Sequence, residues 1–307
     1  MATLRTAAKI LTIGSRGSQL ALWQARHVAS QLTKLGVASH IEIIKTTGDH
    51  LQTASLVQAG GKGLFTKEIE DALLNGTIDL AVHSLKDLPT DNPGELCIAA
   101  IPEREDPRDA LAGKRLDELA EGARVGTSSG RRGAQLRRLR PDLRVEPIRG
   151  NVDTRLRKLK EGGYDAIMLA AAGLRRLGWQ DEIAQLFWPE EICPAPGQGA
   201  LAIQTRENSD AREICALLND EATEQCVTCE RTVLARLDAG CQLPVGVFAG
   251  VHGSELQVQA IVISPDGREC IKGQGKGACS RPEELGHKIA EDLLFRGAKS
   301  ILTIGSE

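Results

Sequence analysis

The sequence predicts an α/β protein with two lobes, each built on a mixed, mainly parallel sheet, followed by a small C-terminal α+β domain with a three-stranded antiparallel sheet. Short apolar strands alternate with helical segments through the first two thirds of the chain, which is typical of βαβ units. Two proline-marked interruptions, at 102–107 and 194–199, bracket an internal block, as in a two-lobed binding protein with one lobe inserted into the other. The predicted domains are 1–102 with 198–220, then 103–197, then 221–307.

The first lobe begins with a buried strand, a turn and a helix. Ser18 is placed to cap this helix and Gly36 to end it. The glycine run 60–63 could be mistaken for a phosphate-binding loop, but Lys62 is not followed by Ser or Thr, so a glycine hinge fits better. The predicted strands are 9–14, 40–47, 78–82, 96–101 and 200–205, and the predicted helices are 20–35 and 64–75.

The pattern changes after about residue 220. A long helix precedes three strand-like segments, and the turns between these strands contain Gly253 and Gly267, which predicts an antiparallel sheet. The predicted elements are the strand 165–170 and a helix around Leu174 in the internal block, then helix 223–238, strands 245–253, 255–263 and 268–275, and helix 281–295.

The stretch from Arg124 to Lys160 is the most unusual part of the chain. It holds ten Arg and two Lys against three acids, a balance of +9 in a chain with a net charge of −3. Such a concentration of like charge is costly unless an anion neutralises it, and Arg is suited to two-pronged binding of carboxylate or phosphate. A solvated helix face is the ordinary explanation of a charge run, but here the charges gather where strands end and helices begin.

Two predicted helix starts in this stretch carry arginines. Arg131 and Arg132 follow the small-residue turn 126–130, and Arg149 precedes a second helix that Asn151 can cap. The exposed N–H groups and the dipole of a helix start also favour an anion. The pattern indicates one anionic ligand with several acid groups. Nucleic acid is disfavoured, because the stretch lacks Phe, Tyr and Trp and the sequence pI is about 6.1.

Four polar residues of the first lobe follow predicted strand ends. Arg16 and Ser18 come after the first strand, and Lys86 and Asp87 come after the third. Because ligands bind beyond the carboxyl ends of parallel strands, we expect these side chains to share one edge of the sheet. Asp87 is then an ionised acid among cations. From spacing alone, a turn residue before Leu88 is an equally good explanation of Asp87.

The eight cysteines are expected to be free thiols, because the chain is large and its N-terminus shows no export signal. Cys226 and Cys229 form a lone Cys-x-x-Cys without the further ligands that a metal site needs, so we predict no metal. Cys241 lies most clearly on a loop, although chemistry alone selects none of the eight. The longest apolar run, 166–174, is too short to span a bilayer, so we expect a cytoplasmic protein.

Four motifs taken together resemble one family over nearly the whole chain. They are Val82–Pro89, Gly126–Ser129 with Arg131 and Arg132, Arg149–Val152 with Thr154 and Arg155, and Gly240–Pro244. They strongly resemble the porphobilinogen deaminase family, also called hydroxymethylbilane synthases. The resemblance implies two periplasmic-binding-protein-like lobes and a C-terminal cofactor-tethering domain. It also implies a transferase that joins four porphobilinogen molecules head to tail into hydroxymethylbilane, releasing ammonia, in the biosynthesis of haem, chlorophyll or corrins.

The resemblance also implies roles for individual residues. The family primes itself with a dipyrromethane cofactor held by a thioether, here to Cys241, and its acid is here Asp87. Lys62 and Phe65 match the family's mobile active-site loop. The expected carboxylate-binding residues are Arg16, Ser18, Lys86, Ser129, Arg131, Arg132, Arg149, Arg155 and Arg176.

The residues suit the implied chemistry. Each pyrrole brings an acetate and a propionate, and each charge-assisted hydrogen bond to them contributes about 1.5–3 kcal/mol. Loss of ammonia from the substrate leaves an electron-poor cation, which an ionised Asp87 would stabilise, and Asp87 can also assist proton transfer.

Three residues depart from the family's pattern. Gly130 stands where Leu is usual, which should loosen the helix start before Arg131. Gln58 stands where Lys is common, and Gln204 stands where Glu is usual. We expect these departures to affect loop behaviour and rate more than the activity itself.

Other classes of protein are weaker explanations. A non-catalytic anion-binding protein would need the arginines but neither Asp87 nor Cys241, and a regulator on the same lobes should carry a DNA-binding segment. An inactive family member would not be expected to retain both residues. The expected partner is therefore the small molecule porphobilinogen, for a monomer that binds neither nucleic acid nor membrane.

Overall fold

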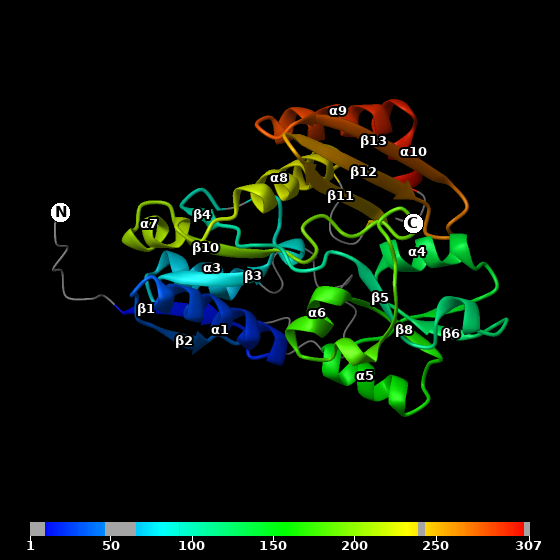
Figure 1. Ribbon diagram of the computed structural model, residues 1–307, viewed down its shortest axis with the longest axis horizontal. Helices are drawn as coiled ribbons and strands as arrows, with labels where there is room; N and C mark the ends of the chain where they lie inside the picture. Colours follow the sequence, from blue (N-terminus) through cyan, green and yellow to red (C-terminus); the bar gives the residue numbers. More distant parts are fainter. Residues whose placement is uncertain (1–9, 47–65, 92, 239–242, 304–307) are drawn as a thin grey trace. The chain divides into compact units, whose positions relative to one another are not determined.

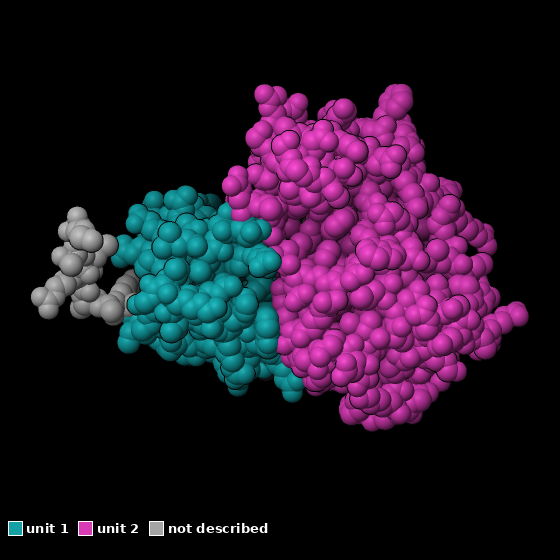
Figure 2. All heavy atoms as spheres, viewed as in Figure 1, with its two compact units in different colours: residues 1–103, 201–220 teal, residues 104–200, 221–307 magenta. Residues whose placement is uncertain are grey.

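The computed structural model describes residues 10–46, 66–91, 93–238 and 243–303. The chain divides into two compact units, residues 1–103 with 201–220 and residues 104–200 with 221–307 (Figure 2). The C-terminal residues therefore fall into the same unit as the internal block. The three-domain boundaries expected from the sequence stay a prediction.

The first unit is built on a five-stranded mixed sheet in the order β2-β1-β3-β10-β4 (Figure 1). β1 runs parallel to β2 and β3, whereas β10 is antiparallel to β3 and β4. The strand after the second proline-marked crossing thus returns to the first sheet. The elements are β1 (Leu11–Ser15), α1 (Gln19–Lys34), β2 (Ser39–Ile43), α3 (Lys67–Leu74), β3 (Leu80–Ser84), η1 (Leu85–Asp87), β4 (Leu96–Ala100), β10 (Leu201–Arg206) and α7 (Asp210–Ala216).

Helices cover both faces of this sheet. Leu80 and Val82 of β3 belong to the apolar cluster that includes α1 and α7. Ala81 points to the opposite face, because side chains alternate along a strand, and packs with Ile69 and Leu73 of α3. His83 follows the same alternation and lies on the α3 face. The predicted cap of α1 is confirmed, since the Ser18 hydroxyl accepts a hydrogen bond from Ala21 N at 3.2 Å.

The second unit contains a five-stranded sheet in the order β7-β6-β8-β5-β9. β6 is parallel to β7 and β8, and β5 is antiparallel to β8 and β9. The two predicted helix starts of the Arg-rich stretch are confirmed as the starts of α4 and α5, but β5 and β9 were not predicted. The elements are β5 (Asp109–Gly113), η2 (Leu116–Glu118), β6 (Arg124–Gly126), α4 (Gly130–Leu139), β7 (Arg144–Glu146), α5 (Val152–Lys160), β8 (Ala166–Ala170), α6 (Ala171–Arg176), η3 (Gln180–Glu182) and β9 (Ile183–Leu186).

This second sheet also has an apolar layer on each face. Leu136 of α4 packs with Val125, Met168 and Phe187 on one face. Leu156 of α5 and Leu174 of α6 belong to the cluster on the other face. A strand covered on both faces needs apolar residues at consecutive positions, as in β8, and Ala, Val, Ile and Leu supply them in a chain with only 3% aromatic residues.

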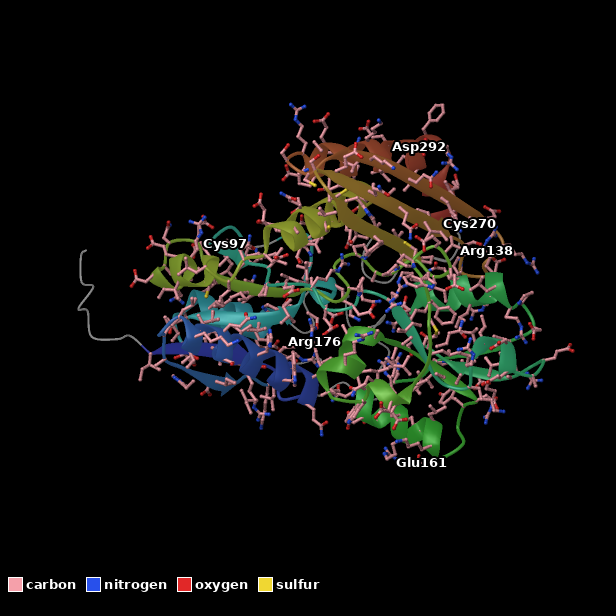
Figure 3. The ribbon with its side chains drawn as sticks, viewed as in Figure 1. Cys97, Arg138, Glu161, Arg176, Cys270 and Asp292 are labelled. Atoms are coloured by element: carbon pink, nitrogen blue, oxygen red, sulfur yellow. The ribbon has the colours of Figure 1, made fainter. Side chains whose placement is uncertain are left out.

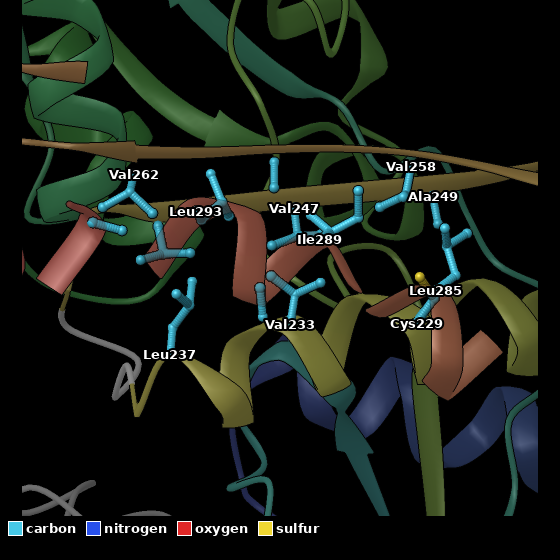
Figure 4. Close-up of a cluster of buried hydrophobic side chains, with 14 of the residues drawn as sticks. Cys229, Val233, Leu237, Val247, Ala249, Val258, Val262, Leu285, Ile289 and Leu293 are labelled. Atoms are coloured by element: carbon cyan, nitrogen blue, oxygen red, sulfur yellow. The ribbon is translucent and has the colours of Figure 1, made fainter. Parts of the chain in front are cut away.

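The rest of the second unit is the predicted α+β part, with antiparallel strands in the order β11-β12-β13. α8 and α9 pack on this sheet through residues such as Val233, Val247 and Ile289 (Figure 4). A smaller cluster joins Ala134 of α4 to Ile261 of β12, so the two sheets of this unit share apolar contacts. The elements are α8 (Glu221–Arg236), β11 (Val245–His252), β12 (Glu255–Ile263), β13 (Cys270–Ala278), α9 (Pro282–Phe295) and α10 (Ala298–Thr303).

The seven described cysteines are all free thiols, as predicted. Cys226 and Cys229 lie buried on α8, and burial raises their pKa values, to about 11 for Cys226 and about 12 for Cys229. These thiols are therefore protonated and poorly reactive at neutral pH. Within the described ranges, no helix combines the length and apolar character that crossing a membrane requires.

Candidate active site

Arg16, Ser18, Lys86 and Asp87 lie at one edge of the first sheet. β1 and β3 are neighbouring parallel strands with Ile13 opposite Leu80, so their carboxyl ends coincide. Arg16 directly follows β1, and Lys86 and Asp87 form η1 directly after β3. The expected grouping at one edge is confirmed for this unit, while the roles of the residues stay predictions.

Asp87 is presented to solvent by a short, well-anchored turn. Leu85 and Leu88, on either side of it, are 0% and 2% exposed, whereas Asp87 is exposed. The Leu88 N–H donates to Leu85 O at 3.1 Å, which closes the turn. Two buried leucines thus hold the backbone and leave the carboxylate at the edge of the sheet, beside Lys86.

A buried histidine stands directly behind this edge and had not been selected from the sequence. His83 is 8% exposed, and its Nε2 lies 3.0 Å from Oε1 of Gln204, which is fully buried on the neighbouring strand β10. Burial lowers the pKa of His83 to about 4, although the Gln204 contact and the charge of Asp87 act in the opposite direction. His83 is therefore neutral at neutral pH.

In the second unit, the expected ligand-binding residues also follow strand ends. β7, β6 and β8 are adjacent and parallel, so their carboxyl ends share one edge. Ser129 follows β6, Arg149 follows β7, and Arg176 ends the helix that follows β8 (Figure 3). Ser128 Oγ donates to Ile148 O at 2.8 Å and joins the loops that carry Ser129 and Arg149. The structure thus brings Ser129 and Arg149 to a common edge of the second sheet, and Arg176 lies at the far end of the helix that begins at this edge.

Among the arginines expected to bind the ligand, Arg131 and Arg132 stand apart because they are buried against an internal carboxylate. Arg131 Nη1 lies 2.6 Å from Asp109 Oδ2, and Arg132 Nε lies 2.8 Å from Asp109 Oδ1. Asp109 is 0% exposed, and the two arginines are 5% and 6% exposed. The two guanidinium charges hold the pKa of Asp109 well below its usual range, despite burial acting the other way.

Asp109 was not among the predicted site residues, because β5 was not predicted from the sequence. Asp109 is the first residue of β5 and lies opposite Ala170, the last residue of β8, in the antiparallel pairing. The same pairing places Asp109 at the edge where Arg131 and Arg132 begin α4. Part of the positive charge attributed to an external anion is therefore neutralised within the protein. The two arginines and Asp109 together still carry one net positive charge.

A second buried carboxylate connects the two proline-marked crossings to the C-terminal elements. Glu230 of α8 is 0% exposed and accepts from Arg104 Nη1 at 2.7 Å, Gly197 N at 2.7 Å and Ala249 N at 2.8 Å. The crossings also contact each other, since Glu105 N donates to Gly199 O at 3.2 Å. A Cβ on Gly199 would collide with the Glu105 carbonyl, so only glycine fits there.

Gln198 links this network to the arginine cluster. Its Nε2 donates to Asp109 Oδ1 at 3.0 Å, and its Oε1 accepts from Arg132 Nη2 at 3.2 Å. Its backbone oxygen accepts from Arg104 Nε at 2.8 Å. A continuous set of hydrogen bonds therefore runs from Glu230 to Arg132.

The remaining arginines have varied surroundings. Arg176 is 8% exposed and donates to Gly199 O at 2.7 Å, and burial lowers its pKa to about 10, so it stays charged at neutral pH. Arg155 Nε donates to Gly150 O at 2.8 Å. Asn151 directly precedes α5, but its side chain makes no capping hydrogen bond, contrary to our expectation. Its backbone oxygen accepts from Arg155 N at 3.0 Å and closes the first turn instead.

Several expected residues cannot be placed. Lys62 and Phe65 of the expected active-site loop, Gln58, and the expected tether Cys241 lie outside the described residues. Gly130 is described and exposed, and α4 begins at it. The Ser129 hydroxyl accepts from Arg132 N at 3.4 Å, so the helix start retains its cap despite the glycine.

The fold defines a two-lobed α/β protein with a C-terminal α+β part, and cationic residues follow the strand ends of each lobe's sheet. The comparisons with known proteins make this class specific. The model of the "porphobilinogen deaminase, dipyromethane cofactor binding domain" matches residues 11–214, and that of the "porphobilinogen deaminase, C-terminal domain" matches residues 224–295. The chain belongs to the porphobilinogen deaminase family, transferases of tetrapyrrole biosynthesis that carry a dipyrromethane cofactor.

Similar proteins match over almost their full length. The porphobilinogen deaminase of Syntrophobacter fumaroxidans is 45% identical over 96% of this chain and 97% of its own. That of Syntrophus aciditrophicus is 47% identical over 95% of this chain and 97% of its own. Among solved structures, a periplasmic substrate-binding protein of an ABC transporter from Coxiella burnetii covers 68% of this chain and 91% of its own, with 13% identity and a TM-score of 0.41.

Proposed function

We propose that this chain carries out the family's head-to-tail condensation of porphobilinogen with Asp87 as the catalytic group and Cys241 as the point of cofactor attachment. The observation that supports the role of Asp87 is its position: an exposed carboxylate on a turn anchored by buried Leu85 and Leu88, at the strand edge that also carries Arg16. The carboxylate can accept a hydrogen bond from a pyrrole N–H and stabilise positive charge on the substrate when ammonia leaves.

The donor set of the second unit fits a dipyrromethane group. Each pyrrole carries two carboxylates, and the edge of the second sheet offers several guanidinium groups, which bind carboxylates in a two-pronged geometry. The cofactor, when bound, supplies the pyrrole carbon to which new substrate units are joined. The residues that would hold its carboxylates are Ser129, Arg131, Arg132, Arg149, Arg155 and Arg176.

The chain's own residues then have distinct tasks. Arg16, Ser18 and Lys86 bind substrate carboxylates next to Asp87. The capping role of Ser18 uses its oxygen as an acceptor and leaves its O–H as a donor for this purpose. Lys62 and Phe65 act in the active-site loop. Gln58, where Lys is common, leaves this loop with one cation fewer.

The role of Asp87 is tested by Asp87→Asn, which keeps the shape of the side chain and removes its charge. We expect turnover to fall by at least about 10²–10⁴-fold while the fold survives, as for loss of a group that transfers a proton or stabilises charge. Asp91→Asn is a matched control, because Asp91 is an exposed acid four positions along the chain. Near-normal turnover of the purified Asp87→Asn protein would rule out the assignment.

The attachment of the cofactor is tested by the intact mass of the purified protein beside Cys241→Ser. We expect the mass to exceed the sequence value by two pyrrole units in the parent protein and not in the variant. If the parent mass is unmodified but added porphobilinogen produces the adduct, the protein was purified as the apo-enzyme. If no adduct forms at all, a non-catalytic binding protein becomes the better explanation.

We also propose that the chain acts as a monomer in the cytoplasm. The seven described cysteines are all free thiols, which supports the location, because the cytoplasm is a reducing compartment. Light scattering coupled to gel filtration should give the mass of one chain, and a mass of two chains would contradict the proposal.

A further inference from the structure

We propose that Gln204 is a positioning residue of the Asp87 edge: as an uncharged partner it fixes the buried His83 ring in one tautomer and one orientation, without the negative charge that would pair with an imidazolium. The proposal rests on the role of Asp87 stated above. It concerns residues of the first unit alone, and nothing in the family assignment requires it.

The geometry of the pair is fixed by the sheet. In the antiparallel pairing of β3 and β10, His83 lies opposite Ala202, and Gln204 lies opposite Ala81. All four side chains therefore point to the same face, toward α3. His83 Nε2 and Gln204 Oε1 lie 3.0 Å apart, and the two residues are 8% and 0% exposed. Water cannot readily replace this contact.

The contact selects one form of the imidazole. An amide oxygen can only accept, so His83 Nε2 must carry the hydrogen, and Nδ1 is then left as an acceptor in the neutral ring. Among the described residues, the amide Nε2 of Gln204 has no hydrogen-bond partner, so the contact of Oε1 with His83 is the one that fixes this side chain. Glu70 of α3 lies near the amide, and Gln204 acts to lower the pKa of Glu70 against the larger effect of its burial.

The charged groups that face His83 come from three further elements. Asp87, with Lys86 beside it, lies on η1, Arg16 follows β1, and Glu70 lies on α3 beyond the amide. Asp87 favours a charged imidazole and Arg16 opposes it, and burial is the largest effect and opposes it as well. With a neutral amide at position 204, burial prevails. A carboxylate at the same position would instead face the imidazole directly and pair with its charged form.

The consequence is an edge whose charge does not change between mildly acidic and neutral pH. His83 lies four positions before Asp87 in the chain. Protonation of His83 would therefore add a buried cation close to the catalytic carboxylate and to Arg16 and Lys86. Burial opposes this protonation, and an uncharged side chain at position 204 leaves burial as the dominant effect. The residue acts on the reaction only through His83 and through the field at Asp87, which is why we class it as a positioning residue.

The experiment compares the parent protein with Gln204→Glu. The ring nitrogens of its six histidines are observed by NMR in ¹⁵N-labelled protein, and His83 is assigned by its loss in His83→Gln. We expect His83 in the parent to show the neutral Nε2–H tautomer from pH 8 down to pH 5. In Gln204→Glu we expect the imidazolium at pH 7, together with an ionisation between pH 6 and 8 in kcat that the parent lacks.

Gln24→Glu is the matched control. Gln24 is also buried, at 3% exposed, but it lies on α1 and donates to Ser84 Oγ at 2.9 Å on the opposite face of β3. This variant should leave the His83 titration unchanged. Titration of parent His83 near pH 6.5, or the same His83 titration in Gln204→Glu as in the parent, would overturn the proposal. Both NMR results are independent of Asp87→Asn, so failure of the catalytic assignment and failure of this proposal are distinguishable.

Discussion

The strand-end edges of the two sheets treat buried polar groups in opposite ways. Behind Asp87, the buried His83–Gln204 pair is neutral, and its partners are an amide and an imidazole. Beside Arg131 and Arg132, the buried group is an ionised carboxylate, Asp109, that faces two guanidinium groups. The first arrangement keeps charge out of the interior, and the second compensates charge inside it. The difference indicates that the net charge at a strand-end edge depends on the buried groups behind it as well as on the exposed residues.

The largest expected effect concerns the charged edge, where Asp109 pairs with Arg131 and Arg132. In Asp109→Asn, two buried arginines lose their counter-charge, and the amide NH₂ would face donors. Removing one partner of a buried ion pair costs about 3–5 kcal/mol, so we expect a loss of that size in the free energy of unfolding, measured by urea denaturation.

Asp142→Asn provides the control for this measurement. Asp142 also pairs with an arginine, Arg140, but both side chains are 27% exposed and water can replace the contact. We expect only a small change. If the two variants lost equal stability, the neutralising role of Asp109 would be wrong, and the arginines would owe their burial to packing alone.

The second prediction concerns the neutral side and its pH dependence. The folded-state pKa of His83, about 4, lies below the ordinary value of 6.5, so the unfolded chain binds the proton more readily. The stability contributed by the neutral histidine is complete above pH 6.5 and declines as the pH falls toward 4. Between pH 7 and 5, we expect His83 to account for a loss of about 2 kcal/mol.

This contribution can be isolated with His83→Gln, in which a neutral amide donor replaces the imidazole N–H. As the pH falls from 7 to 5, the parent should lose stability relative to the variant, because His83 takes up a proton in the unfolded chain but not in the folded protein. A difference that stays constant from pH 7 to 5 would show that His83 has the same pKa in the folded protein as in the unfolded chain, and the contrast between the two edges would disappear.

The sequence predicted the exposed residues of both edges better than the buried ones. Arg16, Lys86, Asp87 and Ser129 could be placed because strand ends and turn residues have local patterns. Asp109 could not be placed, since β5 begins within a charged, proline-rich segment and is defined by its pairing with β8 rather than by its own periodicity. A long-range partner leaves no local trace in the chain.

The same limit applies to His83 and Gln204. Both residues belong to features that were identified in the sequence, His83 within the Val82–Pro89 motif and Gln204 as a departure from the family's pattern. Neither observation shows that they meet, because their contact spans 121 positions and depends on the register of β3 with β10. An apolar strand pattern predicts that a strand is buried, but not which strand lies beside it.

The smallest expected effect tests whether the charged edge owes its geometry to the helix start or to Asp109. Gly130 is exposed at the first position of α4, and it is not among the glycines with positive φ, so a side chain is tolerated there. Gly130→Ala should stabilise the protein by about 0.5 kcal/mol, because alanine lowers the entropy of the unfolded chain and has the better helix propensity.

Gly133→Ala is the control, because a Cβ there would lie 3.1 Å from Arg137 Nη1 and 3.4 Å from Val145, which offsets the gain. If Gly130→Ala also raised turnover, the loose helix start would limit the reaction. Unchanged turnover with the expected gain in stability would mean that the buried contacts of Arg131 and Arg132, chiefly with Asp109, hold them in place without a rigid helix start.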